Sequence, residues 1–161
     1  MIDAVVDFIH HNLGAELAVF IAAAFPVVEV RGAIPLGISL GLSPFDTLVT
    51  SLVGSMLPVP FILLALRRLF RFLSQFQPFK KLVDRLTART LAKGKQVKRY
   101  GMWGLLLFVG VPIPGTGVWT GSMIAVLLGL PLRGVLPTIF CGNLIAALAV
   151  LLLTQGVAAL F

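Results

Sequence analysis

Two charged residues separated by one position stand out in the first apolar part of the chain. Glu29 and Arg31 lie in the string Pro26-Val-Val-Glu29-Val-Arg31-Gly32-Ala-Ile-Pro35. Ionisable side chains at membrane depth are costly, so they usually face a cavity or a partner. There a guanidinium can hold an anionic head group, and a carboxylate in low dielectric can take up and release a proton. The alternatives are a structural ion pair between two segments, or side chains that snorkel to the membrane surface.

A second segment of suitable chemistry is Pro112-Ile-Pro114-Gly115-Thr116-Gly117. Proline removes backbone donors, and glycine lets a ligand approach the backbone closely. A helix that starts at Val118 would present free N–H groups there, which favour an anion. The alternative is helix packing, which also uses small residues and hydroxyls.

These two segments, with two polar residues beyond them, define the predicted site. Trp119 adds an indole donor, and Asn143 lies inside a later apolar run, where it either lines a path or hydrogen-bonds to another helix. The residues predicted for substrate binding or coupling are Glu29, Arg31, Gly32, Pro35, Pro112, Pro114, Gly115, Thr116, Gly117, Trp119 and Asn143.

The composition is that of an integral membrane protein. The chain has 161 residues, of which 58% are hydrophobic and only 12% are charged. Soluble domains carry about 25% charged residues. The mean hydropathy of +1.04 is too high for a soluble domain of this size.

The net charge of +7 comes from one segment, because most of the 13 Lys and Arg residues lie within 67–99. Such a block between apolar halves is typical of a cytoplasmic loop, and it excludes the spread basic face of a nucleic-acid-binding protein. Lys81, Arg85 and Arg89 recur every four residues on an expected amphipathic surface helix, with Leu82 and Leu86 on another face. They either attract anionic lipids or serve only as an orientation signal.

Two apolar runs are long enough to span a membrane, and two others are not. Residues 45–66 and 134–160 reach the necessary length of about 20 residues. Residues 13–25 and 101–111 each cover about half a bilayer and are followed by a Pro/Gly-rich break and a further apolar piece. This pattern predicts re-entrant hairpins, as in transporters built from broken helices. The alternative is a plain bundle of four to six spans.

When the sequence is aligned with itself at a shift of 88 residues, part of the first half matches part of the second half. Gly41-Leu42 falls on Gly129-Leu130, and Gly54 falls on Gly142. With one span in each copy, the second copy must be inverted in the membrane. We therefore predict one all-α integral membrane domain: an inverted repeat of a re-entrant helical hairpin plus a transmembrane helix. The first copy is 1–66, the second is 101–161, and the basic amphipathic cytoplasmic helix lies in 67–100.

The strings around Glu29–Pro35 and Pro112–Gly117 resemble the two signatures of the small multi-drug export protein family, which is grouped with the DedA/VTT superfamily. The resemblance covers nearly the whole chain. It implies two oppositely oriented re-entrant hairpins that meet at mid-membrane. It also implies a role like that of DedA relatives, which are implicated in moving polyprenyl phosphate or phospholipid across bacterial membranes with ion coupling.

We therefore expect a transporter that moves an anionic lipid with proton coupling. We expect the protein to be located in a prokaryotic inner membrane, with residues 67–99 in the cytoplasm and both termini outside. A small-molecule or multidrug exporter and an ion channel are the alternatives. An enzyme is least expected, because His10 and His11 are the only histidines and Cys141 is the only cysteine. No cofactor, metal or nucleic acid is expected. The expected partners are membrane lipids. A bundle of so few helices would also gain from a second copy of the chain, so we expect a homodimer.

Overall fold

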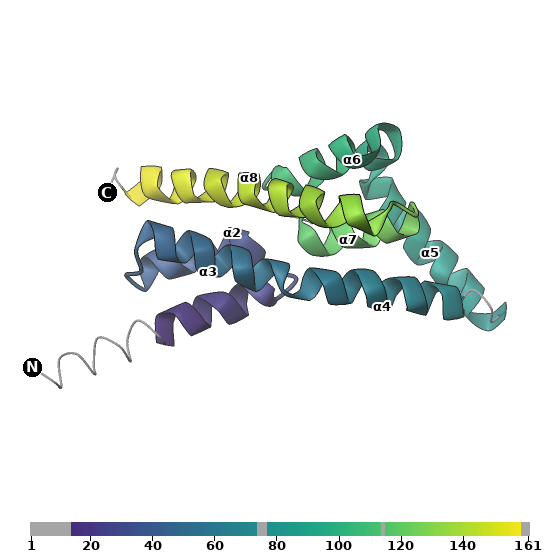
Figure 1. Cartoon of the computed structure of the whole chain (residues 1–161), viewed down its shortest axis with the longest axis horizontal. Helices are drawn as coiled ribbons and strands as arrows, with labels where there is room; N and C mark the ends of the chain where they lie inside the picture. The colour runs from purple at the N-terminus through teal and green to yellow at the C-terminus, as the bar shows by residue number, and fades with distance from the viewer. Residues whose placement is uncertain (1–13, 74–76, 114, 159–161) are drawn as a thin grey trace, which may run out of the picture. The chain divides into compact units, whose positions relative to one another are not determined.

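The structure is a computed structural model that describes residues 14–73, 77–113 and 115–158, and these residues form helices and connecting turns without a strand (Figure 1). The predictions that concern Pro114, His10 and His11 lie outside the described residues. An all-helical chain is the expected result for a protein that must satisfy its backbone hydrogen bonds without water.

The chain divides into two compact units, which we describe separately. Unit 1 is Met1–Leu57 with Leu144–Phe161, and unit 2 is Pro58–Asn143. Unit 1 contains the helix Gly14–Ala24, α2 (Glu29–Ser39), α3 (Pro44–Met56) and the later part of α8 (Leu132–Ala158). Unit 2 contains α4 (Pro58–Leu73), α5 (Gln77–Lys93), α6 (Lys95–Gly110), α7 (Val118–Leu127) and the first part of α8.

In unit 1, α2 and α3 form a helical hairpin (Figure 1). The start of α3 is fixed locally, because the Ser43 side chain accepts a hydrogen bond from the backbone N–H of Asp46 at 3.1 Å and Pro44 occupies the first turn. One face of α2 packs on the helix Gly14–Ala24 through Ala33. Another packs on α8 through Val30 and Ile34, which meet Ala146 and Ala147.

In unit 2, α7 packs against α4, α5 and α6. α6 is kinked at Gly101, whose φ of +57° and ψ of −125° are not helical. Arg67 of α4 donates a hydrogen bond to the backbone carbonyl of Leu130, at the turn between α7 and α8. One member of the basic segment therefore has a structural partner that its charge alone did not predict.

The same turn occurs twice, at positions 88 residues apart. Gly41 follows α2 with φ +81°, and Gly129 follows α7 with φ +66°. In both places the next residue donates its N–H to the carbonyl five positions earlier at 3.0 Å. This hydrogen bond and the left-handed glycine define a Schellman ending, and they fall where the sequence shift aligned Gly41-Leu42 with Gly129-Leu130.

A close helix contact recurs at the same shift. A Cβ placed on Gly54 would lie 2.5 Å from the carbonyl oxygen of Phe20, and one placed on Gly142 would lie 2.9 Å from that of Leu106. Each glycine therefore lets its helix pack directly on the backbone of the helix that precedes the hairpin break. The two glycines aligned by sequence perform the same packing role.

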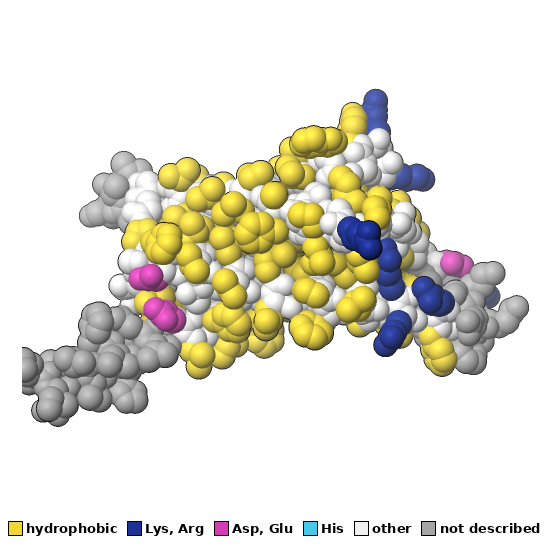
Figure 2. Space-filling model, in the orientation of Figure 1, with side chains coloured by type: hydrophobic (Ala, Val, Ile, Leu, Met, Phe, Trp, Pro, Cys, Tyr) yellow, Lys and Arg dark blue, Asp and Glu magenta, His cyan; other side chains and the backbone are white. Residues whose placement is uncertain are grey.

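The two predicted spans are confirmed as helices that are long and apolar enough to cross a membrane. They cover Pro44–Phe72 and Leu132–Val157, and only 33% and 39% of their most apolar windows are buried. Hydrophobic side chains cover much of the surface visible in Figure 2. The large exposed ones include Phe61, Leu152 and Leu153. Such outward-facing apolar side chains suit a lipid environment and not water.

The first break is shorter than the sequence suggested. The irregular backbone covers only Phe25–Val28, because α2 begins at Glu29 and includes Pro35. The charged residues therefore lie in the first turn of a helix and not in extended chain. The second break agrees better, since α7 begins at Val118 as expected.

Replacing Gly54 with Ala is expected to destabilise unit 1. The added methyl group meets the Phe20 carbonyl at 2.5 Å, and overpacking of this kind costs about 1–3 kcal/mol. Gly156 of α8 is the matched control, because a Cβ there meets nothing within 4 Å. Thermal unfolding in detergent should show a lower midpoint for G54A and an unchanged or slightly higher one for G156A. Equal midpoints would contradict the close packing.

Candidate functional site

The first site begins at the turn that separates the helix Gly14–Ala24 from α2. The carbonyl of Phe25 accepts hydrogen bonds from the N–H groups of Val28 at 3.3 Å and Glu29 at 3.1 Å. Glu29 has a φ of +47°, and it is the one non-glycine residue with positive φ among those described. A left-handed conformation costs a non-glycine residue about 1–2 kcal/mol. Strain of this kind is concentrated at functional positions in proteins.

Glu29 and Arg31 form an ion pair. Arg31 Nη1 donates to Glu29 Oε2 at 2.8 Å, so the structure brings together the two charges that the sequence singled out. The Glu29 side chain is 4% exposed, whereas that of Arg31 is 20% exposed. The carboxylate is therefore inside, and part of the arginine side chain reaches the surface of the described structure. A buried carboxylate next to a partly accessible guanidinium can bind an anion at the guanidinium and exchange a proton at the carboxylate.

Gly32 and Pro35 support the pair from the same helix. A Cβ on Gly32 would lie 2.7 Å from Cγ1 of Val28, so the glycine lets α2 turn back over the break. Pro35 is exposed inside α2, where its ring leaves one backbone hydrogen bond of the helix unmade. Both residues shape the backbone of α2 beside the ion pair.

Three hydroxyl side chains lie along one face of α3. Thr47, Ser51 and Ser55 are all fully buried. Thr47 is placed by its contact with α2, because a Cβ on Gly37 would lie 2.6 Å from Thr47 Cγ2. Sequence reasoning missed Thr47 and Ser51, although their four-residue spacing in an apolar helix was visible. That spacing puts all three side chains on one face.

The second segment forms a tight loop in unit 2. The Thr116 hydroxyl lies 2.8 Å from the carbonyl oxygen of Ile113 and 3.0 Å from that of Val111, so it bonds the loop to itself. Gly115 has φ +83°, and Gly117 has φ +127° with ψ −170°, a region that essentially only glycine adopts. The glycines are therefore required by the backbone of this loop.

The loop leads into the N-terminus of α7, and a lysine lies beside it. Gly117 caps α7 without a side-chain hydrogen bond. A Cβ on Gly115 would lie 3.4 Å from Nζ of Lys93, which ends α5. The helix terminus and the ammonium group both favour an anion. The sequence placed Lys93 only in the basic segment, and nothing in the spacing indicated that it would meet Gly115.

The other predicted residues of unit 2 are spread over several elements. Pro112 is exposed in the loop, Trp119 is half-buried in the first turn of α7, and Asn143 is 2% exposed in α8. Glu29 and Arg31 belong to unit 1, so the site is described here as two separate parts. Pro114 is outside the described residues.

The predicted basic face is present on α5. Lys81, Arg85 and Arg89 are exposed, whereas the side chains of Leu82 and Leu86 lie outside the description. The Lys and Arg side chains drawn on unit 2 in Figure 2 lie at its surface. These three cations are therefore available to a lipid surface or to solvent.

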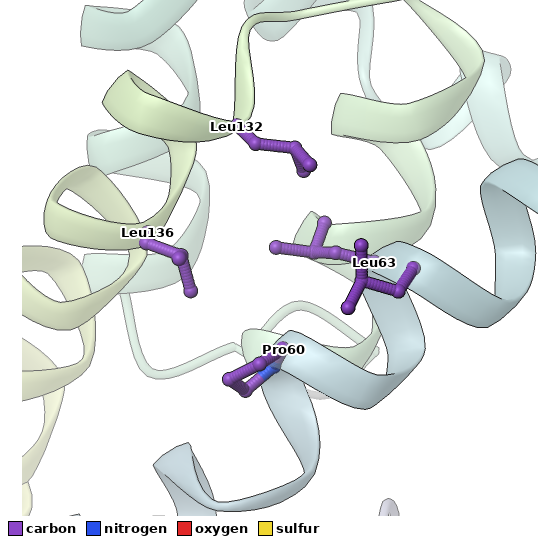
Figure 3. Close-up of a pocket in the computed structure, with 5 residues that line it drawn as sticks. Pro60, Leu63, Leu132 and Leu136 are labelled. Carbon is purple, nitrogen blue, oxygen red and sulfur yellow. The ribbon is translucent and has the colours of Figure 1, made fainter.

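An apolar pocket of about 100 Å³ lies between α4 and the start of α8. Figure 3 shows Pro60 and Leu63 from α4 opposite Leu132 and Leu136 from α8. It carries no polar side chain and so has no chemistry of its own. Within the described ranges, no three His, Cys, Asp or Glu side chains come together as a metal ion would require.

Comparison with known proteins supplies a family. Neither a curated protein nor a solved structure matches the chain. One family, described as "Putative small multi-drug export protein", matches residues 29–149, which begin at the buried glutamate and include Arg31 and the whole of the second candidate segment. The match covers well over half of the 161 residues. Together with two helices able to cross a membrane, it shows that the chain is a helical membrane protein that belongs to the small multi-drug export protein family.

Proposed function

We propose that this chain is a proton-coupled membrane transporter whose substrate is an anionic lipid, such as polyprenyl phosphate or a phospholipid. Glu29 carries the proton, and Arg31 binds the anionic group. The observation that supports this most directly is the Glu29–Arg31 ion pair, with its carboxylate buried and its backbone strained at the first residue of α2. Because both residues belong to α2, this pair does not join two helices.

The loop of unit 2 supplies a second anion-binding element in this proposal. The N-terminus of α7, which no side chain caps, and the ammonium group of Lys93 are both suited to phosphate oxygens. Thr116 closes the loop, and Gly115 and Gly117 provide its shape. On this account the predicted hydroxyl donor of Thr116 acts on the protein backbone and not on the substrate.

We further propose that the two halves are an inverted repeat with re-entrant hairpins. The recurrence of the Schellman ending and of the glycine packing at a shift of 88 supports duplication. At this shift Glu29 corresponds to Gly117, and both have positive φ at the start of a helix. The first copy therefore carries an acid where the second has glycine, which leaves a single proton carrier in each chain.

The topology proposed for this arrangement follows from the charges. The basic residues of 67–99 lie in the cytoplasm of a prokaryotic cell, with both termini outside. Lys81, Arg85 and Arg89 attract anionic lipid head groups to that surface, each contributing about 1 kcal/mol. Because so few spans enclose little space for a substrate, we propose that two copies of the chain form a homodimer.

Export of small molecules is the second candidate, and the family description favours it. The buried carboxylate suits this function as well, since a cationic compound and a proton can compete for one carboxylate. The two functions differ in the ligand that Arg31 would meet. An anion is attracted to it and a cation is repelled.

Purified protein in vesicles of phosphatidylcholine and phosphatidylglycerol separates the two candidates. Fluorescent phosphatidylglycerol reports lipid movement, and ethidium reports export of a cation. The lipid function predicts faster flipping of the labelled lipid than in protein-free vesicles, with no ethidium transport. Ethidium transport without lipid movement would replace it by the exporter function, and movement of neither probe would contradict both.

A further inference from the structure

One contact fixes the register of the hydroxyl row on α3 against α2. A Cβ on Gly37 would lie 2.6 Å from Cγ2 of Thr47, and α2 and α3 pack along each other from the turn that joins them. Stepping one helical turn at a time away from that turn pairs Ala33 with Ser51 and then Glu29 with Ser55. From this register we expect the row to lead toward the buried carboxylate.

Two of these hydroxyls have no hydrogen-bond partner among the described residues. They are Oγ1 of Thr47 and Oγ of Ser51, both completely buried. Hydroxyls in helices usually bond to a carbonyl of the preceding turn, as Ser122 does at 2.5 Å and Ser55 at 3.0 Å. An unpaired buried hydroxyl is costly, and an ordered water is one of the few explanations for it.

Unit 2 shows that packing does not require these hydroxyls. At the shift of 88, Thr47 corresponds to Val135 and Ser51 to Ile139, and both apolar residues are completely buried. At these two positions the equivalent face is closed with hydrocarbon, whereas Ser55 corresponds to Asn143, which is polar and buried. The positions of Thr47 and Ser51 carry hydroxyls only in the copy that also carries the buried glutamate.

The spacing of the row suits bridging waters. Residues four apart on a helix are about 6 Å apart along its axis. One water that makes hydrogen bonds of about 2.8 Å on each side spans nearly the same distance. At the far end of the row is Asp46, which is exposed and accepts a hydrogen bond from the Ser43 hydroxyl at 2.6 Å. A chain of hydroxyls and waters can thus join an exposed carboxylate to a buried one.

We propose that Thr47, Ser51 and Ser55 bind ordered waters that conduct protons between Asp46 and Glu29. This inference rests on the proposed function and names its coupling ion and route. The charged groups of unit 1 that the structure describes are Glu16, Glu29, Arg31 and Asp46. Arg31 is the ion-pair partner of Glu29, and the row would give the carboxylate a proton route that does not pass through this arginine.

Proton flux through hydroxyl variants tests the route. The protein is reconstituted in vesicles of phosphatidylcholine and phosphatidylglycerol that contain a pH-sensitive dye, and a pH gradient is imposed. Thr47→Val and Ser51→Ala are expected to slow internal acidification about tenfold, because each breaks the hydrogen-bonded chain. Thr47→Ser keeps the hydroxyl and should conduct like the wild-type protein.

The matched control is Thr50→Val, the same chemical change on another face of α3, where Thr50 is half-buried. Its flux should equal that of the wild-type protein. Hydroxyl variants that conduct as fast as T50V would overturn the route. If a sodium gradient accelerated lipid movement and a pH gradient did not, the proton route would be overturned and sodium would be the coupling ion.

Lipid movement separates this inference from the proposed function. A wild-type protein that moves labelled lipid without protons overturns the proton route and leaves transport standing. A wild-type protein that moves neither lipid nor protons overturns both. In the hydroxyl variants we expect slower proton flux with lipid exchange retained when no gradient is applied, which a purely structural role would not produce.

Discussion

Glu29→Gln is expected to abolish transport driven by a pH gradient while the protein still accumulates in the membrane. Glutamine has nearly the same shape and keeps a hydrogen-bonding oxygen for Arg31 Nη1, but it cannot carry a proton. Because the proton step is removed and not merely slowed, we expect a loss of about 100-fold or more in gradient-driven rate, or over 2.7 kcal/mol in the barrier. Flux of labelled lipid into reconstituted vesicles measures it.

The double variant Glu29→Gln/Arg31→Gln distinguishes this function from a structural ion pair. Removing one partner of a fully buried pair costs about 3–5 kcal/mol, and a smaller loss is expected for this part-buried pair, whereas replacing both partners can be nearly neutral. Arg31→Gln alone should therefore lower the unfolding temperature, and the double variant should unfold at nearly the temperature of the wild-type protein. Our account predicts that stability returns and transport does not. If transport returned with stability, the pair would be structural.

Gly117→Ala should cause the second large effect. Gly117 has φ +127° and ψ −170°, and residues with a Cβ essentially never adopt this conformation. Alanine would force the loop to rearrange at the start of α7, which displaces the N–H groups proposed to bind the substrate. We expect lipid transport to fall at least about tenfold, since loop displacement of about 1 Å is enough for such losses.

Gly129→Ala provides the comparison for that variant. Gly129 also has positive φ, but its value of +66° lies in the left-handed region, where a side chain costs only about 1–2 kcal/mol. It ends α7 and does not touch the proposed site. G129A should lower the unfolding temperature modestly and keep its transport. If G117A transported as well as G129A, the loop would not be part of the site.

Much of the fold follows from hydropathy and from a few local signals. Two long apolar runs predicted the spans, and the Gly41-Leu42 and Gly129-Leu130 pairs aligned by the shift of 88 lie at equivalent turns in the structure. The first break was predicted too long, because the Pro/Gly-rich string after residue 25 extends to Pro35, which in the structure lies inside α2. Pro35 is tolerated inside α2, and its ring is exposed at the surface and not packed against another helix.

The candidate site was only partly predictable. An acid and an arginine in apolar sequence are conspicuous, so Glu29 and Arg31 could be found from composition alone. The left-handed backbone of Glu29 could not, since it depends on how the preceding turn packs. The approach of Lys93 to Gly115 and the contact of Thr47 with Gly37 are tertiary contacts, which residue spacing does not specify.

The most direct test of the central claim is lipid movement driven by a pH gradient in vesicles that contain either the wild-type protein or Glu29→Gln. Glu29 is the one buried carboxylate among the described residues, so the gradient should act through it. We expect an imposed gradient to accelerate flipping of labelled phosphatidylglycerol by the wild-type protein and to have no effect on E29Q. Equal acceleration of both proteins would contradict the claim that Glu29 carries the coupled proton.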